Sequence, residues 1–164
     1  MVTLNCKIMR GCSGSGKSTY VKNNFPKATV LSTDDFWLDA EGKYNFDPKK
    51  AGEAHAWNLR RFVDFVKYWY EVQEDEVDDC KTDVTVVVDN TNTTVAELAP
   101  YAAVAGAFGF NVEIITIDVT TDIAHPRNVH SVPQPVVHGQ RRNLVANNGY
   151  IPKWWKHKIV TQES

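Results

Sequence analysis

The sequence predicts an α/β fold built on a parallel sheet, and three observations carry this prediction. Strand-like runs recur at 3–9, 28–32, 84–88 and 112–118, each followed by a turn or a helix-compatible segment. The run at 84–88 is almost continuously apolar, as expected for a central strand covered on both faces. A glycine-rich loop separates the first run from a helix-compatible segment at 18–24, the arrangement of a phosphate-binding unit.

Longer helices are predicted between and after these strands. Residues 48–70 carry apolar side chains at spacings of three, four and seven, and Asp47 and Pro48 supply a cap and a first-turn proline. An alanine-rich helix is expected over 95–108, ended by Gly106 and Gly109. Beyond Asp118 three prolines interrupt the pattern, so we expect an irregular, mobile basic lid over about 120–142.

Length and composition predict one domain spanning residues 1–164. The formal net charge is −2, so a nucleic-acid partner would need a local basic patch. Three cysteines without metal-ligand spacing indicate reduced thiols. No stretch approaches the roughly 18 apolar residues of a membrane span. We therefore expect an intracellular, cytoplasmic protein with no membrane partner, in the host's cytoplasm if the protein is viral.

The glycine-rich loop matches the pattern G-x-x-x-x-G-K-[ST] in full. Its glycines allow successive N–H groups to turn inward around a phosphate. Lys17 would reach the outer phosphates of ATP, and the Ser18 hydroxyl would bind Mg²⁺. The predicted ATP-binding residues of this loop are Gly11, Ser13, Gly14, Ser15, Gly16, Lys17, Ser18 and Thr19.

Carboxylates follow two of the predicted strands, where open α/β sheets bind their ligands. Asp34 and Asp35 come just after the second strand, and either one could take the proton of an acceptor hydroxyl. The alternative is a structural role at a helix start. Asp89 directly follows the 84–88 strand and could hold Mg²⁺ through water or orient the acceptor. Asn90 and Thr91 add donors and acceptors there.

Phosphoryl transfer also needs cations, because charge develops on the equatorial oxygens of the migrating group. Arg127, Arg141 and Arg142 in the lid segment are the candidates to contact ATP. The three histidines of that segment match no zinc pattern.

Two other charged segments have simpler interpretations. The acidic run at 71–79 is typical of a solvated helix end or loop. The tail at 150–164 contains Trp154 and Trp155 among lysines, which suits either a packing anchor or stacking with nucleic acid.

Four motifs, at 11–19, at 32–36, at 88–92 and around Arg127, occur in the order and spacing of a known family. The chain resembles the P-loop kinase domain of bacteriophage polynucleotide kinase and its small single-domain relatives. A further block at 44–58 resembles the relatives, AAA-type ATP-binding proteins, and the likeness covers about residues 1–145. It implies a three-layer P-loop kinase fold with a parallel sheet in the order 2-3-1-4-5 and a helical lid.

The resemblance also implies an activity and individual roles. The activity is transfer of phosphate from ATP, with Mg²⁺, to the 5′-hydroxyl end of DNA or RNA, in repair of cleaved strands. The implied catalytic residues are Lys17, Asp34 as general base and Arg127. The residues assigned to the acceptor are Asp35, Trp37, Asp89, Asn90 and Thr91.

Two departures from the family pattern bear on the acceptor. Trp37 stands where the phage enzyme has an arginine that grips the acceptor's phosphate, and Ser131 stands where it has a second lid arginine. Trp37 could stack a base instead. Two alternatives therefore stay open: a kinase of a mononucleotide or other small alcohol, and a non-catalytic nucleotide-binding module.

Overall fold

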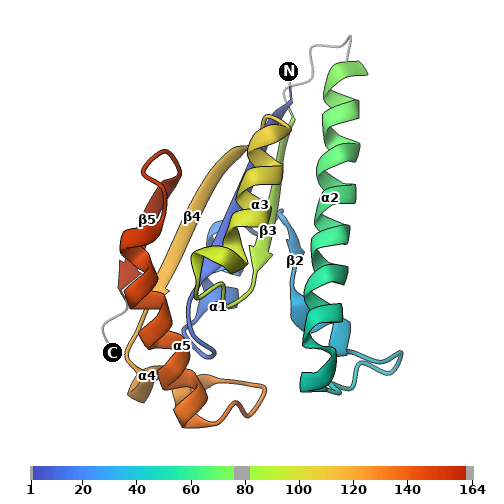
Figure 1. Cartoon of the computed structure of the whole chain (residues 1–164). Coiled ribbons are helices and arrows are strands. Elements are labelled where there is room, and N and C mark those ends of the chain that lie inside the picture. The colour runs from blue at the N-terminus through green and yellow to red at the C-terminus, as the bar shows by residue number, and fades with distance from the viewer. Residues whose placement is uncertain (1, 76–81, 162–164) are drawn as a thin grey trace.

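The computed structural model describes residues 2–75 and 82–161 and has a three-layer α/β architecture (Figure 1). Five strands, all parallel, form one sheet in the order β2-β3-β1-β4-β5. They are β1 (Thr3–Arg10), β2 (Thr29–Leu31), β3 (Asp83–Asp89), β4 (Asn111–Asp118) and β5 (Lys156–Thr161). The predicted fold class and strand order are confirmed, with β1 at the centre and β3 next to it.

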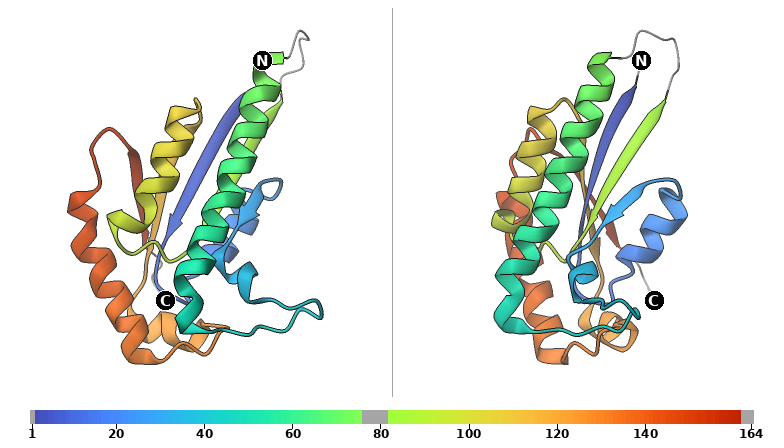
Figure 2. Two further views of the ribbon diagram at one scale, coloured as in Figure 1. Left: turned by 45° about the vertical axis from the view of Figure 1, so that its right-hand side comes forward. Right: turned by 90° about the vertical axis from the view of Figure 1, so that its right-hand side faces the viewer.

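Helices cover the two faces of the sheet (Figure 2). In the right-hand view, α2 and α3 lie on one face and α1 lies on the other. The α-helices are α1 (Lys17–Asn24), α2 (Ala51–Asp75), α3 (Val95–Ala107), α4 (Thr121–Arg127) and α5 (Gln134–Asn147). Three short 3-10 helices, η1 (Thr33–Trp37), η2 (Pro48–Lys50) and η3 (Asn148–Tyr150), connect them. None of the described helices is both long and apolar enough to cross a membrane.

The core consists of two clusters, one on each face of the sheet. Phe62 of α2 and Leu98 of α3 pack against Leu4 of β1 in the first cluster. Val21 of α1 and Val137 of α5 belong to the second. Neighbouring residues of a strand point to opposite faces, so a nearly continuous apolar run such as β3 supplies both clusters.

The segment after Asp118 is not irregular, as its prolines suggested, but forms α4 and the start of α5. Pro133 is the N-cap of α5 and Pro135 lies in its first turn, where a missing N–H leaves no helical hydrogen bond unmade. Pro126 lies in the last turn of the short helix α4. The prolines therefore mark the boundaries of a helical lid.

The resemblance implied a fifth strand, but the residues that form β5 were not identified, because their alternation of lysines with other residues reads as a cationic tail. Lys156 pairs with Glu113 of β4 across the edge of the sheet, at 3.3 Å. Trp155 packs against the first core cluster, whereas Trp154 is 82% exposed. Only one of the two tryptophans is thus a packing anchor. In the acidic run, Glu71 is an exposed residue of α2, and 76–79 lie outside the described residues.

Arg10, the last residue of β1, is completely buried and makes five hydrogen bonds. Its guanidinium donates to the backbone oxygens of Asn92, Thr93 and Leu144 and to side-chain oxygens of Thr116 and Asn148, at 2.8–3.3 Å. Burial lowers the pKa of Arg10 to about 10, with nearby Glu97 opposing the shift. One side chain thereby joins the end of β1, the turn after β3 and the middle of β4 to α5 and η3.

Replacing Arg10 by methionine is expected to lower the free energy of unfolding by about 3–5 kcal/mol, because several buried oxygens lose their donor. Urea unfolding measures the loss. The matched control is Arg60→Met on the exposed face of α2, which should change stability by less than about 0.5 kcal/mol. Equal effects of the two substitutions would contradict a structural role for the buried guanidinium.

Stability is expected to fall on acidification below about pH 6.5, in part through His157 of β5. Burial lowers the pKa of His157, and the positive charge of Arg10 lowers it further. The unfolded chain therefore takes up a proton at a pH where the folded chain does not. The contribution of neutral His157 to the free energy of unfolding is present above pH 6.5 and is lost as pH falls toward the pKa of His157 in the folded protein. Urea unfolding measured from pH 7.5 to 5 should show a shallower decline of the free energy of unfolding for His157→Gln than for wild type. An equal decline in both proteins would exclude His157 as a source of the pH dependence.

Candidate active site

The phosphate loop lies at the carboxyl end of β1 and leads directly into α1. Its Gly16 has a positive φ of 96° and forms the N-cap of α1, so the first free N–H groups of the helix face the loop. A cavity of about 270 Å³ lies over this end of the helix. The cavity is lined by Ser13, Gly14, Gly16, Lys17, Ser18, Thr19, Ser32, Asp34, Asp89, Asn90, Thr91, Arg127, Asn128, Val129, His130 and Val132.

Lys17 folds back over the loop that carries it. Its Nζ donates to the backbone oxygens of Gly11 and Cys12, at 2.9 and 3.1 Å. Burial lowers the pKa of Lys17, while the charges of Asp89, Cys12 and Asp34 act to raise it. An anionic group in the cavity would favour the charged lysine in the same way.

Ser18 and Asp89 form an oxygen pair suited to Mg²⁺. Ser18 Oγ donates to Asp89 Oδ2 at 2.7 Å, and Asp89 Oδ1 is buried with no hydrogen-bond partner among the residues that the structure describes. A buried carboxylate oxygen without a donor needs a cation, and hydroxyl and carboxylate oxygens are the ligands that Mg²⁺ prefers. The pair therefore fits the predicted metal site. Within residues 2–75 and 82–161 no cluster of three or more His, Cys, Asp or Glu is placed to hold a metal.

Helix α4 packs against the phosphate loop at Gly14. A Cβ on Gly14 would lie 2.0 Å from the backbone oxygen of Ala124, and Gly14 has a φ of +79°. Glycine is needed there both for its conformation and for the close approach. This contact holds the end of α4, with Arg127, beside the cavity. Arg127 is exposed and lines the cavity, as a lid cation would.

The two neighbouring aspartates have different surroundings. Both lie in η1, whose N-cap Ser32 accepts a hydrogen bond from the Asp34 backbone N–H. Asp35 turns away to α2, where Arg61 donates two hydrogen bonds to Asp35 Oδ2 at 3.1 and 3.2 Å. Asp34 lines the cavity over the phosphate loop and is 53% exposed. The geometry favours Asp34 over Asp35 as the reactive carboxylate.

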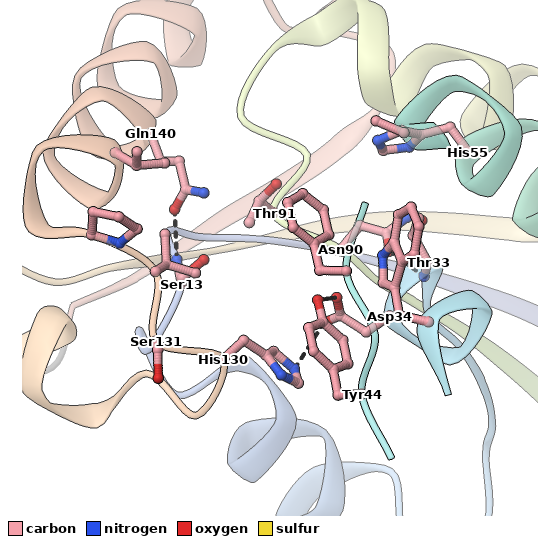
Figure 3. A pocket seen from close by; sticks show the side chains of 16 residues that line it. Ser13, Thr33, Asp34, Tyr44, His55, Asn90, Thr91, His130, Ser131 and Gln140 are labelled. Atoms are coloured by element: carbon pink, nitrogen blue, oxygen red, sulfur yellow. Dashed lines mark hydrogen bonds and ion pairs between the residues drawn. The ribbon is translucent and has the colours of Figure 1, made fainter. Parts of the chain in front are cut away.

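A second cavity of about 450 Å³ adjoins the first and also has Asp34 in its wall (Figure 3). Thr33 and Asn90 lie on one side of it in this view, and Gln140 and Ser131 lie on the other. Asn90 Oδ1 accepts the backbone N–H of Thr33 at 2.8 Å and so ties η1 to the end of β3. The apolar and aromatic part of the lining is Trp37, Tyr44, Phe46, Ala51, Val132, Pro133 and Val136.

Trp37 offers little exposed surface on which to stack a base. The residue is 6% exposed, and its ring makes T-shaped contacts with Phe36 and Phe46, at ring distances of 4.9 and 5.0 Å. This arrangement gives base stacking by Trp37 no support, and contact of Trp37 with the acceptor stays a prediction. Trp37 remains a wall of the second cavity.

The other predicted residues are divided between the site and the scaffold. Asn90 and Thr91 line both cavities. Arg141 Nε donates to Asp118 Oδ1 at 3.1 Å, and Arg142 is exposed on α5. Neither arginine lines either cavity, although Arg141 lies near enough to Cys12 of the phosphate loop for its charge to act on that thiol. Contact of the two arginines with ATP stays a prediction.

Three site residues were missed in the sequence. Gln140 accepts the Ser13 backbone N–H of the phosphate loop at 2.9 Å. Tyr44 and His130 contact Asp34 from two separate loops. Tyr44 belongs to the block at 44–58 that resembles the family relatives, and this was the indication in the sequence that Tyr44 could belong to the site. Nothing in the sequence distinguished His130 from its neighbouring histidines.

Alanine at Gly14 is expected to destabilise the fold by about 2 kcal/mol or more and to weaken ATP binding at least tenfold, because the Cβ would displace α4 from the loop. Urea unfolding and titration calorimetry with ATP measure the two effects. Gly106→Ala in α3 is the matched control: its Cβ meets nothing within 4 Å, and it should stabilise by about 0.5–1 kcal/mol. Wild-type behaviour of Gly14→Ala would show that α4 is not held by this contact.

Similar proteins support the assignment of the fold. NEDD4-binding protein 2 of Homo sapiens is 37% identical over 102 residues, which is 60% of this chain and 5% of that protein. A chain of the Pnkp1/Rnl/Hen1 RNA repair complex superposes with a TM-score of 0.66 at 14% identity, covering 93% of this chain and 47% of that one. The APS kinase CysC of Mycobacterium tuberculosis, in complex with AMPPNP and APS, superposes with a TM-score of 0.57 at 17% identity. This superposition covers 100% of this chain and 91% of that one.

The chain thus spans a small part of the human relative and about half of the RNA repair chain. The superpositions, at identities this low, concern the fold: a P-loop kinase fold with the strand order described above. The model of the AAA_33 family, described as an AAA domain, matches residues 7–134. The match takes in the phosphate loop, both aspartates, Asp89 and the lid helix α4, and the chain therefore belongs to the AAA_33 family of AAA domains.

Proposed function

We propose that the protein is an ATP-dependent phosphotransferase that moves the γ-phosphate of ATP to the 5′-hydroxyl of a polynucleotide. The observation that carries this proposal is the position of Asp34, which lines both the cavity over the phosphate loop and the adjoining larger cavity. A general base for phosphoryl transfer has to lie between donor and acceptor. Asp34 alone among the exposed carboxylates of the two linings meets this condition.

The smaller cavity is the donor half. The N–H groups at the start of α1 and the Lys17 ammonium would hold the β- and γ-phosphates of ATP. Ser18 and Asp89 would hold Mg²⁺, Asp89 directly or through water, and the ion would offset charge on the phosphate oxygens. Arg127 at the end of α4 would add positive charge from the lid side.

The larger cavity is the acceptor half. The acceptor oxygen attacks the γ-phosphorus, its proton passes to an Asp34 oxygen, and the bond from the γ-phosphorus to the leaving oxygen of ADP breaks. Lys17 and Arg127 stabilise the charge that this leaving oxygen gains. Tyr44, Phe46 and the uncharged polar groups of Asn90 and Thr91 suit the terminal nucleoside of a strand. The related fold in an RNA repair complex agrees with this acceptor.

One observation favours a second candidate, a kinase of a mononucleotide or other small alcohol. The sixteen described residues that line the acceptor cavity include no lysine or arginine. A polynucleotide is usually held through its phosphates by such side chains. His55 and His130 are the basic residues of that lining. A small neutral alcohol would need no further cation, whereas a mononucleotide would bring a phosphate of its own, so within this candidate the lining suits a neutral alcohol better.

Transfer from γ-labelled ATP to 5′-hydroxyl DNA and RNA oligonucleotides, nucleosides, mononucleotides and small alcohols tests the proposal. Label is expected on oligonucleotides, and Asp34→Asn should lower kcat by about 10²–10⁴ with ATP binding retained. Asp64→Asn, an exposed carboxylate of α2, is the matched control and should act like wild type. Label on small acceptors alone would select the second candidate. ATP binding without transfer to any acceptor would overturn both and identify a non-catalytic nucleotide-binding module.

A further inference from the structure

Two aromatic rings meet over the carboxylate of Asp34. Tyr44 Oη donates to Asp34 Oδ1 at 3.1 Å, and His130 Nε2 lies 3.4 Å from Asp34 Oδ2. The two rings are stacked, with centroids 4.0 Å apart and planes inclined by 18°. Figure 3 shows the three side chains converging from different segments at the edge of the acceptor cavity.

The segment that carries Tyr44 is internally braced. Leu38 and Tyr44 form an antiparallel bridge, and Gly42 turns the chain between them with a φ of +79°. Asp39 holds the turn: its carboxylate accepts the backbone N–H groups of Glu41 and Lys43, and these bonds help to lower the pKa of Asp39. Tyr44 is therefore presented by a small ordered hairpin.

The segment that carries His130 is braced in a similar way by Asn128. Asn128 Oδ1 accepts the Val132 backbone N–H at 2.7 Å, and its Nδ2 donates to the oxygens of His125 and Val132. Ser131 adopts a left-handed conformation with a φ of +54°. A residue other than glycine rarely holds that conformation unless its surroundings impose it. The lid loop thus has one defined shape, which places the His130 ring against Tyr44.

Asp34 needs such support because little else restrains its carboxylate. The side chain is 53% exposed, and an exposed carboxylate turns freely about its last bond. Burial raises the pKa of Tyr44, and the charge of Asp34 raises it further, so the phenol stays a donor at neutral pH. The hydrogen bond occupies Oδ1, and Oδ2 faces His130 Nε2, so the two rings together restrain both oxygens of the carboxylate. A base held in one orientation loses less freedom when the acceptor binds.

We propose that Tyr44 is a positioning residue for the general base Asp34, and that His130 holds Tyr44 in place by stacking. The inference rests on the proposed phosphotransferase function. The hairpin at 38–44 and the lid loop at 128–132 thus meet over the proposed base. Neither residue exchanges a proton with the substrate.

Tyr44→Phe is the first test, because it keeps the ring and its stack and removes only the phenol oxygen. We expect kcat for transfer to fall about tenfold, the effect of one hydrogen bond to a charged group, with the KM for ATP unchanged. Tyr150→Phe removes a phenol oxygen from a side chain that belongs to η3 and lines neither cavity, and it should leave both constants as in wild type. An unchanged kcat in Tyr44→Phe would overturn the proposal.

Two substitutions of His130 separate stacking from polar contact. His130→Phe keeps a flat ring and should retain most of the wild-type kcat, whereas His130→Ala should be slowed about as much as Tyr44→Phe. The double variant Tyr44→Phe/His130→Ala should be no slower than the slower single variant, because both act on one hydrogen bond. Additive losses, or His130→Phe as slow as His130→Ala, would overturn the role given to the stack.

A measurement on the ligand-free protein keeps this inference separate from the proposed function. The stack should shift the ring-proton NMR signals of His130 upfield in wild type and in Tyr44→Phe, and not in Tyr44→Leu. A wild-type protein that transfers no phosphate to any acceptor contradicts the proposed function, and the inference fails with it. An active wild type in which Tyr44→Leu leaves the His130 signals in place contradicts the inference alone.

Discussion

The candidate active site depends on one buried guanidinium. Arg10 ends the central strand and immediately precedes the phosphate loop, and its hydrogen bonds reach the turn after β3, the middle of β4 and the end of α5. Burying an arginine costs free energy, and hydrogen bonds to five acceptors replace those that its guanidinium would make to water. The result is a rigid support for the phosphate loop. Helix α5 and the phosphate loop consequently share an anchor that lines neither cavity.

The sequence was sufficient for the class of fold and for the group of residues that lines the cavity over the phosphate loop. The phosphate-loop motif is local, and its strand and helix follow it directly, so Lys17, Ser18 and the glycines could be assigned from the motif alone. Asp89 was predictable because it ends an apolar strand next to that loop. The position of strand β5 was not predictable, because an edge strand with one exposed face and alternating lysines lacks the apolar run of β3. The prolines after Asp118 were misleading because proline is tolerated at helix starts as well as in loops.

The acceptor half depends on contacts between segments far apart in the chain, and for this reason the sequence did not reveal it. Arg61 neutralises Asp35 from 26 residues away, and this decides which of two adjacent aspartates is left facing the cavities. Tyr44 and His130 meet only because a hairpin and a lid loop close on each other. Trp37 illustrates how packing limits such an inference. A large aromatic beside a predicted base suggests stacking, whereas here the ring completes a small aromatic cluster with Phe36 and Phe46.

The short helix η1 has a consequence for how such enzymes diverge. Asp34 is mounted on five residues that are capped by Ser32 and tied to β3 through Asn90, so its place is set by the sheet and not by the acceptor. The hairpin at 38–44 lies outside that unit, is held by its own Asp39, and supplies part of the acceptor cavity wall. Under the proposed function, changes in the hairpin would alter which acceptor binds while the carboxylate of Asp34 stays where it is. A fold built this way can change its ligand by exchanging one small loop.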